Sequence, residues 1–85
     1  MNGPLQDETL SFRDRAILRA VARGAAQLLV SSEPDLCVDG RFCSDQLAVR
    51  RLTHAGLIVA AAPGTVGQRV PAGLSPAGHR ELLAG

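Results

Sequence analysis

Two cysteines and two histidines are the residues of this chain whose types could bind a metal or do redox chemistry: Cys37, Cys43, His54 and His79. Zinc sites take close-set ligands, with about two to four residues between cysteines and about three to five between histidines. Neither pair has that spacing, so we expect no metal and no cofactor. We interpret the cysteines as buried, hydrophobe-like thiols across a hairpin, with a redox-sensing pair as the alternative.

Side chains that could act as nucleophiles or acids have structural explanations. Three serines precede predicted helices, where their hydroxyls would cap the helix: Ser11, Ser44 and Ser75. Three acidic residues cluster in one segment that is rich in turn signals: Glu33, Asp35 and Asp39. No nucleophile remains with a histidine and an acid beside it. We therefore expect that the protein is not an enzyme.

Composition indicates one small domain. The chain has 85 residues, 46% of them hydrophobic, and its aromatic residues are Phe12 and Phe42. The formal charge of +1 argues against a protein that coats nucleic acid without sequence preference. The charge is unevenly distributed, however: residues 1–40 carry more acidic than basic residues, and residues 41–85 carry more basic than acidic ones. This asymmetry suits a domain that binds with one side. We expect no signal peptide and no membrane span, and hence a cytoplasmic protein with reduced thiols.

The first half of the chain predicts a helix and then a hairpin. Residues 1–10 read as a flexible leader, and residues 11–85 as the folded domain. A helix is expected over 12–23, capped by Ser11 with Asp14 in a capping box and ended by Gly24. Its apolar stripe comprises Leu10, Ile17, Ala20 and Val21.

Residues 27–43 are expected to form a short hairpin. Two β-prone runs, 27–32 and 36–38, are separated by Pro34, and Asp39-Gly40 is a strong turn signal. The alternative is the short helix that an ordinary helix-turn-helix needs in this place. The proline and the Asp-Gly pair favour the hairpin.

A second helix is expected over 44–55, with Ser44 as its N-cap. The helical period predicts two faces. The inward face comprises Leu47, Ala48, Leu52 and Ala55. The solvent face comprises Gln46, Arg50 and Thr53, with Val49 beside them.

The remaining chain predicts a hairpin and a last helix. Strands are expected over 57–62 and 69–72, joined by a glycine-rich loop, with Pro71 at a sheet edge because proline cannot donate to a ladder. Ser75 and Pro76 then begin a helix over 75–84.

This order of elements predicts an α+β fold, a small winged-helix-type domain: helix, short β-hairpin, helix, wing hairpin and C-terminal helix. The residues Glu33-Pro34-Asp35-Leu36, Val38-Asp39-Gly40, Leu52-x-x-Ala55-Gly56-Leu57-Ile58 and Val70-Pro71-Ala72 resemble a group of small winged-helix-like proteins of high-GC actinomycetes, most of them uncharacterised. The C-terminal pattern is similar to that of MarR- and PadR-like regulators. The resemblance implies fold more than function, and the predicted hairpin at 33–43 departs from the positioning helix of those regulators.

The leading hypothesis is a small regulator that binds double-stranded DNA with helix 44–55 and wing 58–72, as a homodimer through residues 74–84. The side chains expected to contact DNA are Gln46, Val49, Arg50, Thr53, His54 and Arg69. A stripe of cations on the first helix is expected to be solvated, or else to contact phosphate or an acidic partner: Arg15, Arg19 and Arg23. The alternative function is a protein–protein interaction module that does not bind DNA.

Overall fold

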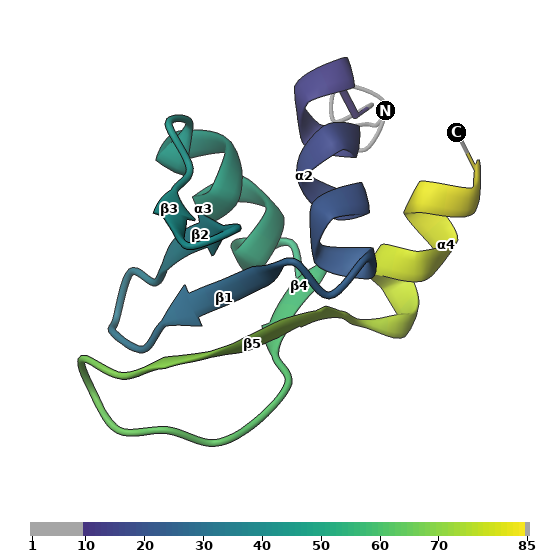
Figure 1. The fold of residues 1–85 in the computed structure, drawn as a ribbon. Helices are drawn as coiled ribbons and strands as arrows, with labels where there is room; N and C mark the ends of the chain where they lie inside the picture. The colour runs from purple at the N-terminus through teal and green to yellow at the C-terminus, as the bar shows by residue number, and fades with distance from the viewer. Residues whose placement is uncertain (1–9, 85) are drawn as a thin grey trace.

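The computed structural model describes residues 10–84, which form an α+β domain (Figure 1). In chain order its elements are α2 (Phe12–Ala22), β1 (Ala26–Leu29), β2 (Asp35–Val38), β3 (Arg41–Phe42), α3 (Gln46–His54), β4 (Ile58–Ala60), β5 (Arg69–Leu74) and α4 (Pro76–Ala84). Of the predicted leader, all but Leu10 lies outside the described residues. Within residues 10–84, no helix combines the length and the apolar character needed to cross a membrane.

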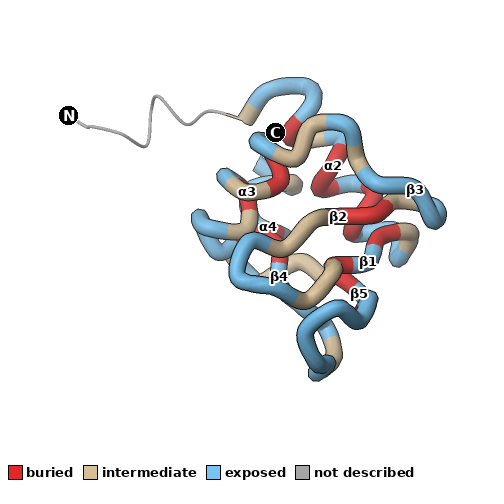
Figure 2. The backbone as a smooth tube through the Cα atoms, turned by 90° about the vertical axis from the view of Figure 1, so that its left-hand side faces the viewer, coloured by how far each residue is buried: buried red, intermediate tan, exposed pale blue. Residues whose placement is uncertain are grey.

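The strands form one antiparallel sheet in the order β3-β2-β1-β5-β4. Leu28 of β1 is paired in register with Leu36 of β2 and Val70 of β5, and all three side chains are buried on one face. Gln27 and Pro71 are paired on the opposite face and are exposed. The helices gather on the first face (Figure 1), so the buried residues lie between the helices and the sheet (Figure 2).

The hairpin predicted within residues 27–43 is confirmed, and no helix lies in this segment. β1 pairs with β2, and β2 pairs with the short strand β3. Asp39 and Gly40 form the turn with φ angles of 52° and 83°. Two successive residues with positive φ are what a tight hairpin turn requires, which explains the Asp-Gly sequence.

Pro71 lies in an internal strand, so the prediction that it occupies a sheet edge was wrong. β5 is flanked by β1 and β4. The Pro71 carbonyl accepts a hydrogen bond of 2.7 Å from the Ala61 N–H, and in an antiparallel sheet the nitrogen of a residue faces the same neighbour as its carbonyl. The Pro71 nitrogen therefore faces Ala61, one residue beyond Ala60, which is the last residue of β4 that pairs with β5. The sheet tolerates proline there because the ladder stops.

The last helix begins as predicted, and its predicted dimer surface, residues 74–84, is largely exposed, although not at every leucine. The Ser75 hydroxyl accepts a 3.0 Å hydrogen bond from the Gly78 N–H, which makes Ser75 the N-cap of α4. Leu74 and Leu82 are partly buried and pack against the core. Leu83 is 84% exposed. Among the leucines of the predicted dimer segment 74–84, Leu83 is therefore the one that is largely free to contact a partner.

Asp14 is a buried carboxylate that joins α2 to α3. The predicted capping box is confirmed: Asp14 accepts from the Ser11 N–H, and the Ser11 hydroxyl accepts from the Asp14 N–H, both at 3.1 Å. The Arg51 guanidinium also donates to both carboxylate oxygens, at 3.2 and 3.4 Å. Burial by itself raises the pKa of Asp14, but the bonds from Ser11 and Arg51 outweigh it and hold the pKa below its ordinary value.

We expect Asp14→Asn to lower the free energy of unfolding at pH 7 by about 1–3 kcal/mol, because it removes a charged partner of the cap and of Arg51. Since the pKa of Asp14 is lowered in the folded state, this stabilisation is present above the ordinary aspartate pKa of about 3.9 and is lost as the pH falls through the folded value.

The measurement is urea unfolding of both proteins at neutral pH and at successively lower pH. The stability difference between them should shrink on acidification. Asp39→Asn, which neutralises an exposed carboxylate in a turn whose positive φ asparagine also adopts, is the control. A difference that stays constant at all pH values would contradict a role for the Asp14 charge.

Candidate nucleic-acid interface

Helix α3 begins at Gln46 and is capped by Asp45, so the predicted N-cap Ser44 was wrong. The Asp45 carboxylate accepts from the Ala48 N–H at 3.0 Å and from Arg13 Nη1 at 3.0 Å. The Ala48 N–H and then the Arg13 guanidinium lower the pKa of Asp45. A carboxylate suits this position because it is attracted to the positive end of the helix dipole, and Arg13 holds it in place.

The Gln46 side chain faces β2 and not the solvent. Its Oε1 accepts from the Leu36 N–H at 3.1 Å, and its Nε2 donates to the carbonyls of Leu36, at 3.1 Å, and Cys43, at 2.6 Å. β3 ends at Phe42, and the next residue, Cys43, still donates its N–H to the Leu36 carbonyl at 2.8 Å. The amide bridges the Leu36 N–H and the Cys43 carbonyl and so satisfies backbone groups at the edge of β2. An amide used in this way is not free to read a base.

This anchoring turns α3 about its axis relative to the predicted orientation. Val49 was expected at the solvent face but is 0% exposed, and Leu47 was expected to pack inward but is 73% exposed. Ala55 is also exposed, whereas Ala48 and Leu52 are buried as predicted. Because Val49 is enclosed in the core, it cannot contact DNA. The exposed side of α3 instead comprises Leu47, Arg51, His54 and Ala55.

Arg50 and His54 face an acidic segment of the same chain. Arg50 Nη2 lies 3.5 Å from Asp35 Oδ1, and Arg50 Nε lies 3.4 Å from Glu33 Oε1 but is too poorly aligned for a hydrogen bond. His54 Nε2 is 3.7 Å from Glu33 Oε2. The Thr53 hydroxyl donates to the Arg50 carbonyl at 3.0 Å. These three predicted DNA contacts are therefore brought together, but they are occupied within the chain.

Arg69, the remaining predicted contact, lies on another part of the molecule. Its guanidinium is stacked over the Phe42 ring, 5.2 Å from the centroid, which is a cation–π contact. Phe42 is 53% exposed and is the register partner of Cys37, which is buried. The loop before Arg69 is fastened to the end of β1, where the Val30 N–H donates to the Gln68 carbonyl at 2.8 Å. Arg69 therefore projects from a braced hairpin.

The arginines that lack a carboxylate partner lie away from α3. Within residues 10–84, salt bridges are formed by Arg13, Arg23, Arg50 and Arg51. No carboxylate lies within ion-pair distance of the other arginines in this part of the chain: Arg15, Arg19, Arg41, Arg69 and Arg80. The cations that remain available to a ligand are thus mainly on α2, β3, β5 and α4.

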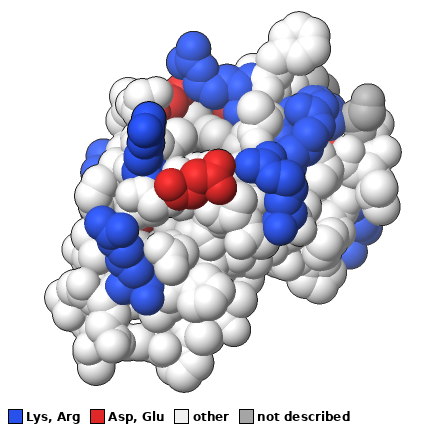
Figure 3. Space-filling view, in the orientation of Figure 1, with Lys and Arg blue, Asp and Glu red and all other residues white. Residues whose placement is uncertain are grey.

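Four exposed arginines form one surface, which we call the basic face: Arg19, Arg23, Arg41 and Arg69. Arg19 and Arg23 are one turn apart on α2. Arg23 lies 3.8 Å from Asp39, which belongs to the turn that leads into Arg41. The next residue, Phe42, stacks against the guanidinium of Arg69. Figure 3 shows arginine side chains spread across this side of the molecule, with few acidic ones among them. In the sequence, the basic face was indicated by the stripe of Arg15, Arg19 and Arg23 on the first helix, of which Arg19 and Arg23 belong to this face.

The cysteines and histidines do not assemble into a centre. Cys37 and Cys43 are both free thiols; Cys37 is buried as predicted, and Cys43 is partly buried. Among the residues that the structure describes, no group of three or more His, Cys, Asp and Glu side chains could hold a metal ion. Comparisons with protein-family models, curated proteins and solved structures gave no match to this chain.

We expect Gln46→Ala to lower the free energy of unfolding by about 1–3 kcal/mol, because it leaves the Leu36 N–H without its acceptor, although the Leu36 carbonyl still accepts from the Cys43 N–H at 2.8 Å. Chemical denaturation measures this directly. The control is Gln27→Ala, at an exposed position of β1, which should change stability by about 0.5 kcal/mol or less. If both variants were as stable as the parent, the Gln46 amide would be free to bind a ligand.

Proposed function

We propose that this chain is a small winged-helix-like domain that binds duplex DNA through the phosphate backbone, and that the basic face is the binding surface. The winged-helix assignment is supported by the order α2, β1, α3, β4, β5 and by the position of β5 between β1 and β4. The hairpin of β4 and β5 corresponds to the wing. β2 and β3 stand where standard regulators have a positioning helix.

The position of the unpaired arginines is the observation that carries this proposal. A guanidinium presents five N–H donors in a planar fork that matches a phosphate, and phosphate contacts supply most non-specific affinity for DNA. Arg19, Arg41 and Arg69 are exposed and without carboxylate partners among the described residues. The pair of Arg23 and Asp39, at 3.8 Å and open to solvent, is weak enough to exchange for a phosphate.

The surroundings of α3 argue against base readout by the predicted residues. The Arg50 side chain is 38% exposed and lies against Asp35 and Glu33. A DNA backbone approaching this end of α3 would meet those two carboxylates, and the repulsion would oppose binding. Backbone binding by the basic face needs no such rearrangement, and it would carry little sequence preference.

Fluorescence anisotropy with a labelled random-sequence duplex tests the proposal. If the four arginines of the basic face each neutralise a phosphate, log K should fall with log salt with a slope of about −3.6. Affinity should then drop about 100-fold between about 50 and about 200 mM salt. Absence of binding at the lower salt concentration would contradict the proposal.

Three variants that each remove one positive charge locate the binding surface. Arg19→Gln and Arg69→Gln should each reduce the magnitude of the salt slope by about one, whereas Arg50→Gln, on α3, should leave it unchanged. Circular dichroism checks that all three remain folded. If Arg50→Gln reduces the slope and the other two do not, α3 is the binding element and the basic face is not.

A protein–protein interaction module is the second candidate. It is favoured by Leu47, a large apolar side chain that is 73% exposed on α3. Failure to bind DNA at low salt would make this the leading function.

A further inference from the structure

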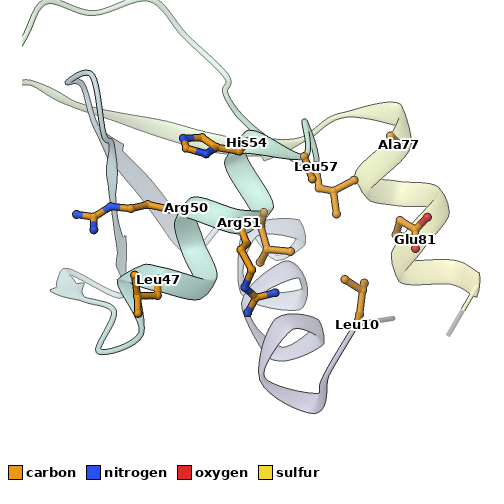
Figure 4. A pocket seen from close by; sticks show the side chains of 10 residues that line it. Leu10, Leu47, Arg50, Arg51, His54, Leu57, Ala77 and Glu81 are labelled. Carbon is orange, nitrogen blue, oxygen red and sulfur yellow. The ribbon is translucent and has the colours of Figure 1, made fainter. Parts of the chain in front are cut away.

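An apolar groove of about 780 Å³ lies between α3 and α4 (Figure 4). Its apolar lining comprises Leu10, Leu47, Leu52, Ala55, Leu57 and Ala77. Leu52 and Leu57 are 2% and 8% exposed, so they form its floor, whereas Leu47 stands at its rim with 73% of its surface exposed. Single exposed leucines are common on protein surfaces. A leucine at the mouth of an apolar groove is instead typical of an interface.

The two walls of the groove differ in charge. The α3 wall carries Arg50, Arg51 and His54, but Arg50 and His54 already lie beside Glu33. Arg51, whose side chain is 64% exposed, is the cation of this wall whose carboxylate partner, Asp14, is buried. The α4 wall carries the carboxylate of Glu81. Arg51 already bonds to Asp14, but a guanidinium has donors for a second carboxylate. The groove therefore has the Arg51 guanidinium on one side and the Glu81 carboxylate on the other, with apolar surface between them.

Such a surface is complementary to itself. A two-fold axis that runs along the groove places each wall of one copy opposite the other wall of its partner, so that every contact occurs twice. The basic α3 wall would then face Glu81 of the partner subunit, and the rim leucine would face the partner's apolar floor. A partner with a uniformly basic or acidic surface would be repelled by one of the two walls.

We propose that the groove between α3 and α4 is a two-fold interface with a second copy of this chain, in which Leu47 of each protomer enters the groove of its partner. This interface overlaps the one expected at residues 74–84, since Ala77 and Glu81 line the groove, but it adds α3 and leaves out Leu83. It goes beyond the proposed function and shares no residue with the basic face. A failure of one proposal is thus distinguishable from a failure of the other.

Light scattering coupled to size exclusion, and sedimentation from about 1 to about 500 µM, test the interface on the full chain. The parent protein should show a dimer mass at the upper end of this range. Leu47→Glu should remain a monomer throughout, whereas Leu83→Glu, at a leucine of α4 that is even more exposed, should behave as the parent. A monomeric parent at every concentration would overturn the proposal, as would dissociation by Leu83→Glu but not by Leu47→Glu.

Charge reversal gives a second and independent test. Glu81→Arg should raise the dimer dissociation constant at least about tenfold, because it places like charges on facing walls. Adding His54→Glu should restore most of the lost affinity. Thermal melts establish that each variant is folded, since both positions are exposed. If Glu81→Arg leaves the dissociation constant unchanged, the two walls do not face each other and the two-fold arrangement is wrong.

Discussion

The Gln46 amide bonds to both the N–H and the carbonyl of Leu36, and the orientation of α3 depends on this pair of hydrogen bonds. The amide bridges the Leu36 N–H and the Cys43 carbonyl, just past the point where β3 ends. With Gln46 turned toward the sheet, Val49 must enter the core and Leu47 must leave it. The surface that α3 offers to a partner therefore follows from a backbone requirement of the neighbouring strand.

The same orientation decides which charges are available for binding. On α3, Arg51 reaches the buried Asp14, and Arg50 lies against Glu33 and Asp35. These pairs draw cations and carboxylates together around α3. The arginines without such partners lie on α2, the hairpins and α4, so a chain of formal charge +1 still presents one face rich in unpaired arginines among its described residues. Local charge, and not net charge, supports the proposed function.

Residue patterns predicted the elements well because their signals are local. The capping box of Ser11 and Asp14, the Asp39-Gly40 turn and the Ser75 cap each depend on a few neighbouring residues, and each is confirmed. The faces of α3 were predicted only in part, because the helical period fits more than one rotation of a short helix. The choice is made by Gln46 reaching Leu36, ten positions away, and by Arg51 reaching Asp14, 37 positions away.

Chemical-shift mapping by NMR, with the labelled protein titrated with random duplex DNA at low salt, tests the central claim most directly. It reports on every backbone amide, so it separates α3 from the basic face in one experiment. Our account predicts that the largest changes occur around Arg19, Arg23, Arg41 and Arg69, with residues 46–54 little affected. Changes confined to residues 46–54 would contradict it and would return base recognition to α3.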